Sequence, residues 1–215
     1  MKLAQGGVSW VAAGCIVVVL FCSITYFSNN FFRGVFGFFS ILFVLITILL
    51  IVFFRDPERT VGSDVVSPAD GFIREITKEK DKDVGNCVKI SIFMNIHNVH
   101  VNRMPIDGVI QKITYFNGGH IPAFKKESER NERVVTLINT SIGRVKLVQI
   151  AGTVARRIVP YVHKGDTVNK GERVGLIRLG SRVDVYLPED GINNVKVTFK
   201  DKVKAGESSI AEIND

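Results

Sequence analysis

Two long apolar runs near the start of the chain constrain its fold most strongly. Apart from Arg33, no charged residue occurs between Leu3 and Phe54. A helix needs about 20 predominantly apolar residues to cross the hydrocarbon core of a bilayer. The segments 8–27 and 35–54 each reach that length. The sequence therefore predicts a hairpin of two transmembrane helices joined by a short polar and aromatic turn.

A secretory signal peptide is the alternative interpretation of the first run. Signal peptides have a shorter apolar region that ends at a cleavage site of small residues. Both runs are longer than that, and the second ends at Phe53 and Phe54 without such a site. We therefore prefer the membrane hairpin.

The positive charges that flank the runs indicate an orientation. Lys2 precedes the first run, and Arg55 and Arg59 follow the second, whereas the connecting turn carries only Arg33. Cytoplasmic loops are enriched in Lys and Arg. We expect both ends of the hairpin, and the part of the chain after it, to face the cytoplasm at the cell membrane.

The part of the chain after Phe54 is mildly basic. It contains all 21 acidic residues and all Lys and Arg residues except Lys2 and Arg33, so its formal charge is +5. Such a charge suits anionic lipid headgroups beside a membrane. The basic and aromatic modules typical of nucleic-acid binding are missing, so we expect no nucleic-acid partner. Cys15, Cys22 and Cys87 are not spaced as metal ligands or as a disulfide framework.

Short β-like segments separated by turns follow the apolar runs. Val88, Ile90 and Ile92 alternate with other residues, which is the pattern of a half-buried strand. Similar segments lie at 109–116, 134–139, 145–150 and 183–187. The run 78–83 alternates charges of both signs and indicates a solvated loop. No long segment of 55–215 has a helical period, so a mainly β domain is predicted there.

A weak internal repeat suggests the architecture of that domain. The segments 164–172 and 200–207 share an Asp-x-Val pattern followed by Gly-Glu. This repeat resembles the flattened β-sandwich, or hammerhead, of biotinyl and lipoyl carrier domains. Such carriers display a modifiable lysine at a hairpin tip, and neither copy offers that tip. We interpret the repeat as a scaffold and not as a carrier.

Gly180 and Ser181 stand in an apolar strand-like segment, where glycine is normally disfavoured. By itself the pair fits an ordinary turn. Glycine followed by serine is also the pair that a self-cleaving chain needs to turn a serine into a pyruvoyl group. The choice between the two interpretations depends on the remaining motifs.

Few other residues carry a chemical signal on their own. His97 and His100 lack a third ligand nearby, so we expect no metal. His100 follows a predicted strand, where a polar side chain can reach a cleft. Asp70 precedes Gly71, which is a common turn pair. The Gly-x-Ser-x-Gly elbow of serine hydrolases and the phosphate-binding glycine loops are absent from the sequence.

Five modest motifs occur in a specific order. They are Phe54-Arg55-Asp56-Pro57-Glu58-Arg59, Ser67-Pro68-Ala69-Asp70-Gly71, His100-Val101-Asn102-Arg103-Met104-Pro105, Asn131-Glu132-Arg133 and Gly180-Ser181-Arg182-Val183-Asp184-Val185. Together they resemble the phosphatidylserine decarboxylase proenzyme family in its short form, to which the archaetidylserine decarboxylases belong. The resemblance covers nearly everything after Phe54.

The resemblance implies a carboxy-lyase that makes its own cofactor. Autocatalytic cleavage between Gly180 and Ser181 would give a β chain of 1–180 and an α chain of 181–215. Ser181 would become a pyruvoyl group that forms a Schiff base with the amine of a serine-headgroup phospholipid. Loss of CO2 would leave the ethanolamine lipid. Phosphatidylserine and archaetidylserine share this headgroup, so the sequence does not choose between them.

The resemblance also implies roles for further residues. Asp70 and Ser181 match two members of the Asp-His-Ser set that long family members use for self-cleavage. Arg103 stands at the matching histidine position and cannot act as a base. His100 matches a second family histidine and is the remaining candidate for a base or an acid.

Three residues are candidates for substrate or structural support. Arg103 could hold a carboxylate or a phosphate. Asn131 and Arg133 belong to a shared motif and are placed in the same group. The identity of the self-cleavage base stays open at this point.

Two other classes of protein fit parts of the sequence. A membrane-anchored β-sandwich adaptor or carrier module would need no catalysis, but its usual long helical hairpins are missing. A self-cleaving amino-acid decarboxylase would share the cofactor, but the membrane hairpin favours a lipid substrate. The sequence leaves the oligomeric state open, a homo-oligomer included.

Overall fold

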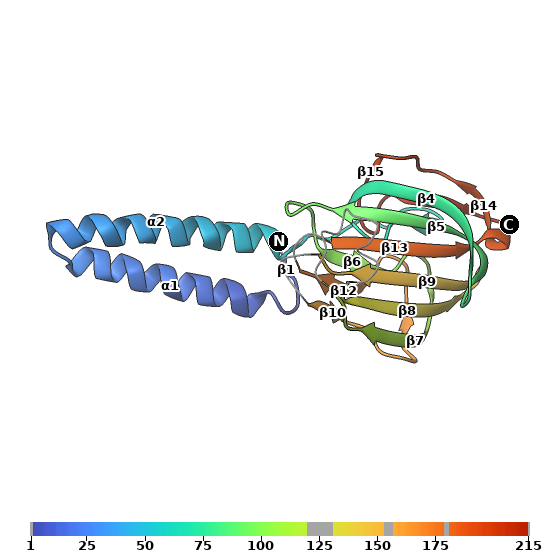
Figure 1. The fold of residues 1–215 in the computed structure, drawn as a ribbon, viewed down its shortest axis with the longest axis horizontal. Coiled ribbons are helices and arrows are strands. Elements are labelled where there is room, and N and C mark those ends of the chain that lie inside the picture. The colour runs from blue at the N-terminus through green and yellow to red at the C-terminus, as the bar shows by residue number, and fades with distance from the viewer. Residues whose placement is uncertain (1, 120–130, 153–156, 179–180, 215) are drawn as a thin grey trace. The chain divides into compact units, whose positions relative to one another are not determined.

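The computed structural model describes residues 2–119, 131–152, 157–178 and 181–214. The chain divides into two compact units, Met1–Glu58 and Arg59–Asp215. Figure 1 shows helices in the first unit and strands in the second. The two units are described separately.

The first unit is a helical hairpin. Helix α1 spans Val8–Phe27 and helix α2 spans Asn30–Phe53. Two short strands, β1 (Lys2–Leu3) and β2 (Arg55–Asp56), pair at its base. Helix α2 begins at Asn30 and not at 35, because the extended residue Asn29 ends the turn and its carbonyl oxygen accepts the Arg33 N–H at 2.8 Å.

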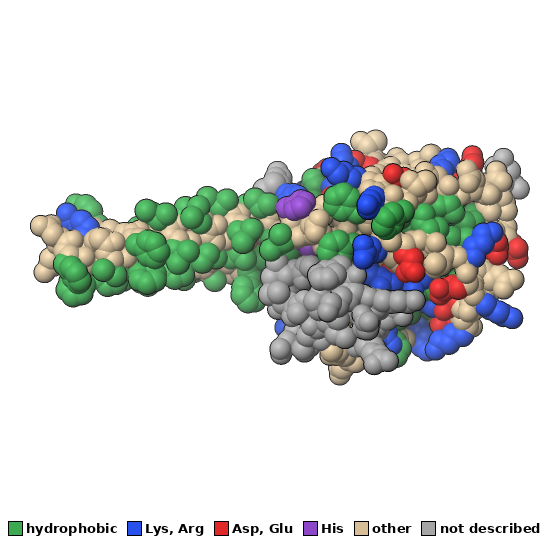
Figure 2. Space-filling model, turned by 45° about the horizontal axis from the view of Figure 1, so that its top comes forward, with side chains coloured by type: hydrophobic (Ala, Val, Ile, Leu, Met, Phe, Trp, Pro, Cys, Tyr) green, Lys and Arg blue, Asp and Glu red, His purple; other side chains and the backbone are tan. Residues whose placement is uncertain are grey.

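The two helices pack through aromatic and small polar side chains. The ring centroids of Phe21 and Phe43 lie 4.7 Å apart, and the hydroxyls of Thr25 and Ser40 are 3.1 Å apart. Both hydroxyls also lie within hydrogen-bond distance of a carbonyl oxygen one turn earlier, which satisfies them without water. The outer surface of the hairpin is apolar, as Figure 2 shows. Both helices are long and apolar enough to cross a bilayer, which supports membrane association.

The second unit is built on an eight-stranded antiparallel sheet with the order β11-β7-β8-β9-β13-β5-β4-β15. In that order the strands span Thr167–Val168, Gly108–Phe116, Arg133–Thr140, Gly143–Ile150, Ser181–Pro188, Gly85–Met94, Gly71–Asp81 and Lys202–Val203. Strand β13 lies in the interior of the sheet, between β9 and β5 (Figure 1).

Two smaller antiparallel sheets complete the unit. One has the order β10-β12-β6, with strands Ile158–Pro160, Arg173–Ile177 and Val101–Arg103. The other has the order β14-β16-β3, with strands Ile192–Val195, Ser209–Ile213 and Val65–Val66. A short 3-10 helix, η2, spans Glu189–Gly191. The prediction of a mainly β domain is confirmed, and the likeness to hammerhead carrier domains stays a prediction.

The large sheet has one face in the main core. Val183, Val185 and Leu187 of β13 are fully buried there, together with Ile90 and Ile92 of β5. Successive side chains on a strand point to opposite faces. The residues between these positions, which include polar ones, therefore line the other face of the sheet.

The charged run 78–83 is not a solvated loop over most of its length. Strand β4 continues through it to Asp81 and stays paired with β5 as far as Gly85. Lys78 and Lys80 are compatible with the strand because their side chains are exposed to water. At the other end of β4, a Cβ on Gly71 would lie 2.1 Å from the Phe93 carbonyl oxygen, so only glycine allows this close pairing.

The internal repeat forms two equivalent turns. Asp166 accepts the backbone N–H of His163 at 2.8 Å, and Asp201 accepts that of Thr198 at 2.7 Å. Gly165 and Lys200, the residues before the two aspartates, have a positive φ. The glycine near the end of each copy, Gly171 or Gly206, has one as well. The repeat therefore has a structural basis in matched aspartate turns.

Candidate active site

Ser181 is the first residue of β13 and is fully buried. Its backbone pairs with Met94 of β5, and its Oγ donates to the Met94 Sδ at 3.5 Å. A thioether is a weak acceptor, so this bond holds the hydroxyl only weakly. Gly180, the other half of the proposed cleavage site, lies outside the residues that the structure describes.

Two buried amide side chains are linked to each other, and one of them contacts Met94. Asn102 Nδ2 is 3.7 Å from the Met94 Sδ, and Gln149 Nε2 donates to Asn102 Oδ1 at 2.8 Å. Asn102 and Gln149 are 0 % and 1 % exposed. The Gln149 bond fixes the direction of the Asn102 amide, so its Nδ2 donor points toward Met94, the residue that also contacts Ser181.

His100 is fully buried just before β6, and its Nδ1 lies 2.9 Å from the Asn98 carbonyl oxygen. A carbonyl oxygen only accepts, so we assign the proton of the neutral ring to Nδ1 and the basic lone pair to Nε2. The His100 carbonyl oxygen accepts the Ile177 N–H at 3.2 Å. This bond places His100 beside Ile177, the last residue of β12, and Ile177 precedes Ser181 by four positions in the chain.

Arg103 lies in β6 and is also buried. Its Nη1 donates to the Gly171 carbonyl oxygen at 2.7 Å, and its backbone N–H donates to the Pro68 carbonyl oxygen at 2.9 Å. Gly206 is packed against it, because a Cβ there would lie 2.9 Å from the Arg103 Cδ. The Arg103 side chain therefore contacts both glycine turns of the internal repeat, Gly171 through its guanidinium and Gly206 through its Cδ.

Asp70 belongs to a separate buried cluster of charges. Its carboxylate accepts Arg59 Nη2 at 2.9 and 3.2 Å and the Ala205 backbone N–H at 2.8 Å. Arg59 Nη1 also donates to Glu207 at 3.1 Å. Burial raises the pKa of Glu207, but its bonds to Arg59 and Lys204 outweigh burial, so the pKa lies below its ordinary value.

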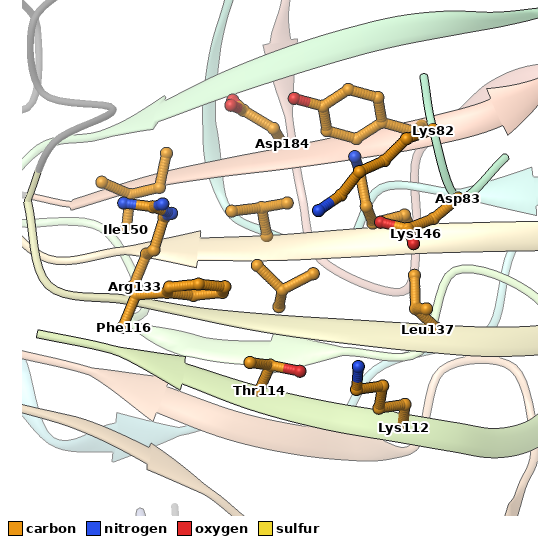
Figure 3. Close-up of a pocket in the computed structure, with 13 residues that line it drawn as sticks. Lys82, Asp83, Lys112, Thr114, Phe116, Arg133, Leu137, Lys146, Ile150 and Asp184 are labelled. Atoms are coloured by element: carbon orange, nitrogen blue, oxygen red, sulfur yellow. The ribbon is translucent and has the colours of Figure 1, made fainter. Parts of the chain in front are cut away.

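Asn131 and Arg133 flank the start of β8. Asn131 is fully buried, and its Nδ2 donates to the Ala151 carbonyl oxygen at 2.9 Å. The Arg133 guanidinium lies over the Phe116 ring, 4.4 Å from its centroid. Figure 3 shows Arg133 on the sheet face that carries Asp184, which is opposite the face of Ser181.

The structure groups the candidate residues in three places. The pairing of β6 with β12 places His100 beside Ile177, four positions before Ser181 along the chain. Asp70 bonds to Arg59 and Ala205, and Arg133 faces the other side of the sheet. Sequence reasoning missed Met94, Gln149 and Arg59 as neighbours of candidates. Only Arg59, the last residue of a shared motif, carried a signal that could have identified it.

Comparison with known proteins assigns the chain to a family. Residues 46–211 match the family model described as phosphatidylserine decarboxylase. A Methanosarcina acetivorans protein named as an archaetidylserine decarboxylase proenzyme is 42 % identical, over 99 % of this chain and 98 % of that protein.

Two bacterial relatives carry the other name of the family. The phosphatidylserine decarboxylase proenzyme of Streptomyces avermitilis is 50 % identical, over 74 % of this chain and 71 % of its own length. The Desulfotalea psychrophila proenzyme of the same name is 46 % identical, over 81 % and 84 %. With the family model and these relatives in agreement, the chain belongs to the phosphatidylserine decarboxylase family.

Proposed function

We propose that the chain cleaves itself between Gly180 and Ser181 and then decarboxylates a serine-headgroup phospholipid to the ethanolamine lipid and CO2. The substrate is phosphatidylserine or archaetidylserine, the two lipids named for its relatives. The observation that carries the proposal is the place of Ser181, buried at the first position of an interior strand. The proenzyme names of the relatives agree with a cleavage step.

Self-cleavage needs no outside oxidant or reductant. The Ser181 Oγ attacks the Gly180 carbonyl carbon, and the peptide C–N bond breaks to leave an ester. Loss of the Ser181 Cα proton and of the ester oxygen from Cβ gives a carboxylate on Gly180 and a dehydroalanine. Water then replaces the nitrogen of the dehydroalanine, which leaves as ammonia, and a pyruvoyl group remains. Its methyl carbon derives from the Ser181 Cβ.

The surroundings of Ser181 fit this group. The Met94 thioether provides an apolar contact suited to a methyl group, and the Asn102 amide provides a donor nearby. When present, the pyruvoyl carbonyl supplies an electrophile for the substrate amine and a sink for the charge left as CO2 departs. Met94 and Asn102 would hold it in this position.

His100 is our candidate for the proton-transferring group. Its Nδ1–H is held by Asn98, which leaves Nε2 to accept or donate a proton. Arg103 is a fixed cation bound to Gly171, so it does not compete for this role. We infer that His100 removes the Ser181 proton during cleavage or delivers a proton after CO2 loss.

Asp70 has a different set of contacts. Its carboxylate is held by Arg59 and Ala205, so we propose that it fixes the turn before β4 and supports the site from a distance. Asn131 has the same kind of role through Ala151. The scaffold formed by the two repeat turns is, in our proposal, of the hammerhead type.

The helical hairpin gives the enzyme access to a lipid substrate. We propose that α1 and α2 cross the cell membrane and that the β unit faces the cytoplasm, as the flanking positive charges suggest. The reacting amine and carboxylate belong to the lipid headgroup, so the chemistry can take place at the membrane surface.

One experiment tests the proposal directly. Purified full-length protein should give two bands on a denaturing gel, and the small fragment should have the mass of 181–215 with a pyruvoyl terminus. Ser181→Ala should leave one full-length band. Wild-type protein that stays intact, or a small fragment whose mass fits an ordinary serine terminus, would contradict the proposal. A cleaved chain excludes the non-catalytic adaptor.

A further inference from the structure

A groove on the large sheet has no part in the proposed reaction. It has a volume of about 310 Å³, which is in the range of small-ligand sites. Alternate residues of β7, β8, β9 and β13 form its floor, and the turn after β4 closes one end (Figure 3). Ser181 faces Met94, whereas Asp184 belongs to the groove. Asp184 comes three positions after Ser181 on β13, and side chains at an odd offset point to opposite faces of a strand, so the groove lies opposite Ser181.

The middle of the floor is apolar. Val135 and Val148 are cross-strand partners there; Val135 is half-buried, and Val148 is buried beside it. Val148, Ile150 and Tyr186 belong to a hydrophobic cluster that is separate from the main core. An outer sheet face normally carries polar residues, so the half-buried Val135 that packs against this cluster is suited to contact an apolar part of a ligand.

Lysines gather at one end of that floor. Lys112 and Lys146 both flank Leu137 in the strand register, and Lys82 reaches the same end from the turn (Figure 3). Lys146 is engaged with Asp81. Lys82 and Lys112 are exposed, and they form no ion pair within the part of the chain that the structure describes. Two lysine ammonium groups therefore remain available to an anion.

The charge of the lining favours a negative ligand. It contains three lysines against the carboxylates of Asp83 and Asp184. Two of these charged side chains have partners outside the lining: Arg182 binds Asp184, and Asp81 binds Lys146. These partners carry one positive and one negative charge, so including them leaves the excess of positive charge unchanged. Two copies of this face would repel each other, which argues against a second copy of the chain as the occupant.

We propose that this groove binds an anionic phospholipid. The phosphate lies between Lys82 and Lys112, and the glycerol and first chain carbons lie on Val135 and Val148. A lipid is the anionic amphiphile available to a membrane-associated chain, and lysine is a common phosphate ligand. The site is independent of the proposed chemistry, because it lies on the opposite face of the sheet from Ser181.

Calorimetric titration of the full-length protein in neutral maltoside micelles tests the proposal. The probe is dihexanoylphosphatidylglycerol, and saturable binding is expected. Lys82→Gln with Lys112→Gln should weaken it by about tenfold or more, because two charge-assisted contacts are lost. The same variant should still show the two-band pattern, since neither lysine lies near Ser181. The gel therefore reports separately on the proposed function.

A matched control separates the groove from the overall charge. Lys80→Gln with Lys164→Gln removes two exposed lysines outside the groove and should leave binding unchanged. Equal losses in the two double variants, or no loss in the groove variant, would overturn the proposal. Binding of glycerol phosphate as tight as that of the lipid would overturn the apolar part. Equally tight binding of zwitterionic dihexanoylphosphatidylcholine would overturn the requirement for an anion.

Discussion

Removal of one partner from the buried ion pair between Arg182 and Asp184 should destabilise β13 strongly. Arg182 Nε lies 2.7 Å from Asp184 Oδ1 and its Nη2 lies 2.8 Å from Oδ2, so the contact is bidentate. The side chains are only 5 % and 2 % exposed. Arg182 Nη2 also donates to the Ser91 hydroxyl at 3.3 Å. Water therefore cannot replace the carboxylate if it is lost.

Asp184→Asn keeps the shape of the side chain but removes its charge. Loss of one partner of a buried pair costs about 3–5 kcal/mol. At about 2–4 °C per kcal/mol for a chain of this size, the melting temperature should fall by about 6–20 °C. The measurement is thermal unfolding of the full-length protein in detergent at pH 7. A Ser181→Ala background keeps every sample uncleaved.

Two further variants make the result interpretable. Arg182→Met with Asp184→Leu removes both charges and should cost much less than the single change, because no uncompensated charge stays buried. Glu189→Gln breaks the exposed pair with Lys78 and should cost less than about 1 kcal/mol. The reasoning is wrong if Asp184→Asn melts within about 2 °C of its parent, or if the double variant melts as low as the single one.

Two other predictions concern pH and cleavage. Burial raises the pKa of Asp81 and Glu207, but hydrogen bonds from cationic neighbours outweigh it, so both values lie below the ordinary 3.8 and 4.5. The stability that these two ionised carboxylates give the folded protein is complete above their ordinary pKa values and is lost as the pH falls through their lowered values. A melting temperature that stays constant from pH 6 to pH 3 would contradict this. Met94→Leu should slow cleavage at Ser181 by about fivefold, because it removes a weak hydrogen bond. An unchanged time course on denaturing gels would argue against that role.

The fold could be predicted where local pattern decides it. Long uncharged runs identify α1 and α2, and alternation identifies most strands of the large sheet. The sequence predicts a solvated loop at 78–83, but 78–81 form the end of β4, because exposed charged side chains are compatible with an extended strand beside β5. The sequence predicts the second helix from 35, but α2 begins at Asn30, because the aromatic residues after Asn29 are compatible with a helix.

The site could be predicted only in part, because its contacts join distant residues. Asp70 meets Arg59 and Ala205, and the latter lies far along the chain. Met94 meets Ser181 only through the register of β5 and β13. Spacing along a sequence carries no information about such a register. The resemblance to a family indicated the candidate residues but could not show which of them touch.

The position of Ser181 explains how the chain could be cut and stay assembled. Cleavage before Ser181 would fall at the start of β13 and break none of its pairing with β9 or β5. The rest of 181–215 is held as well, because β15 pairs with β4 and β16 pairs with β3. Each of these partner strands belongs to 1–180. A cut at this place changes the chemistry at one residue and leaves the sheet around it in register.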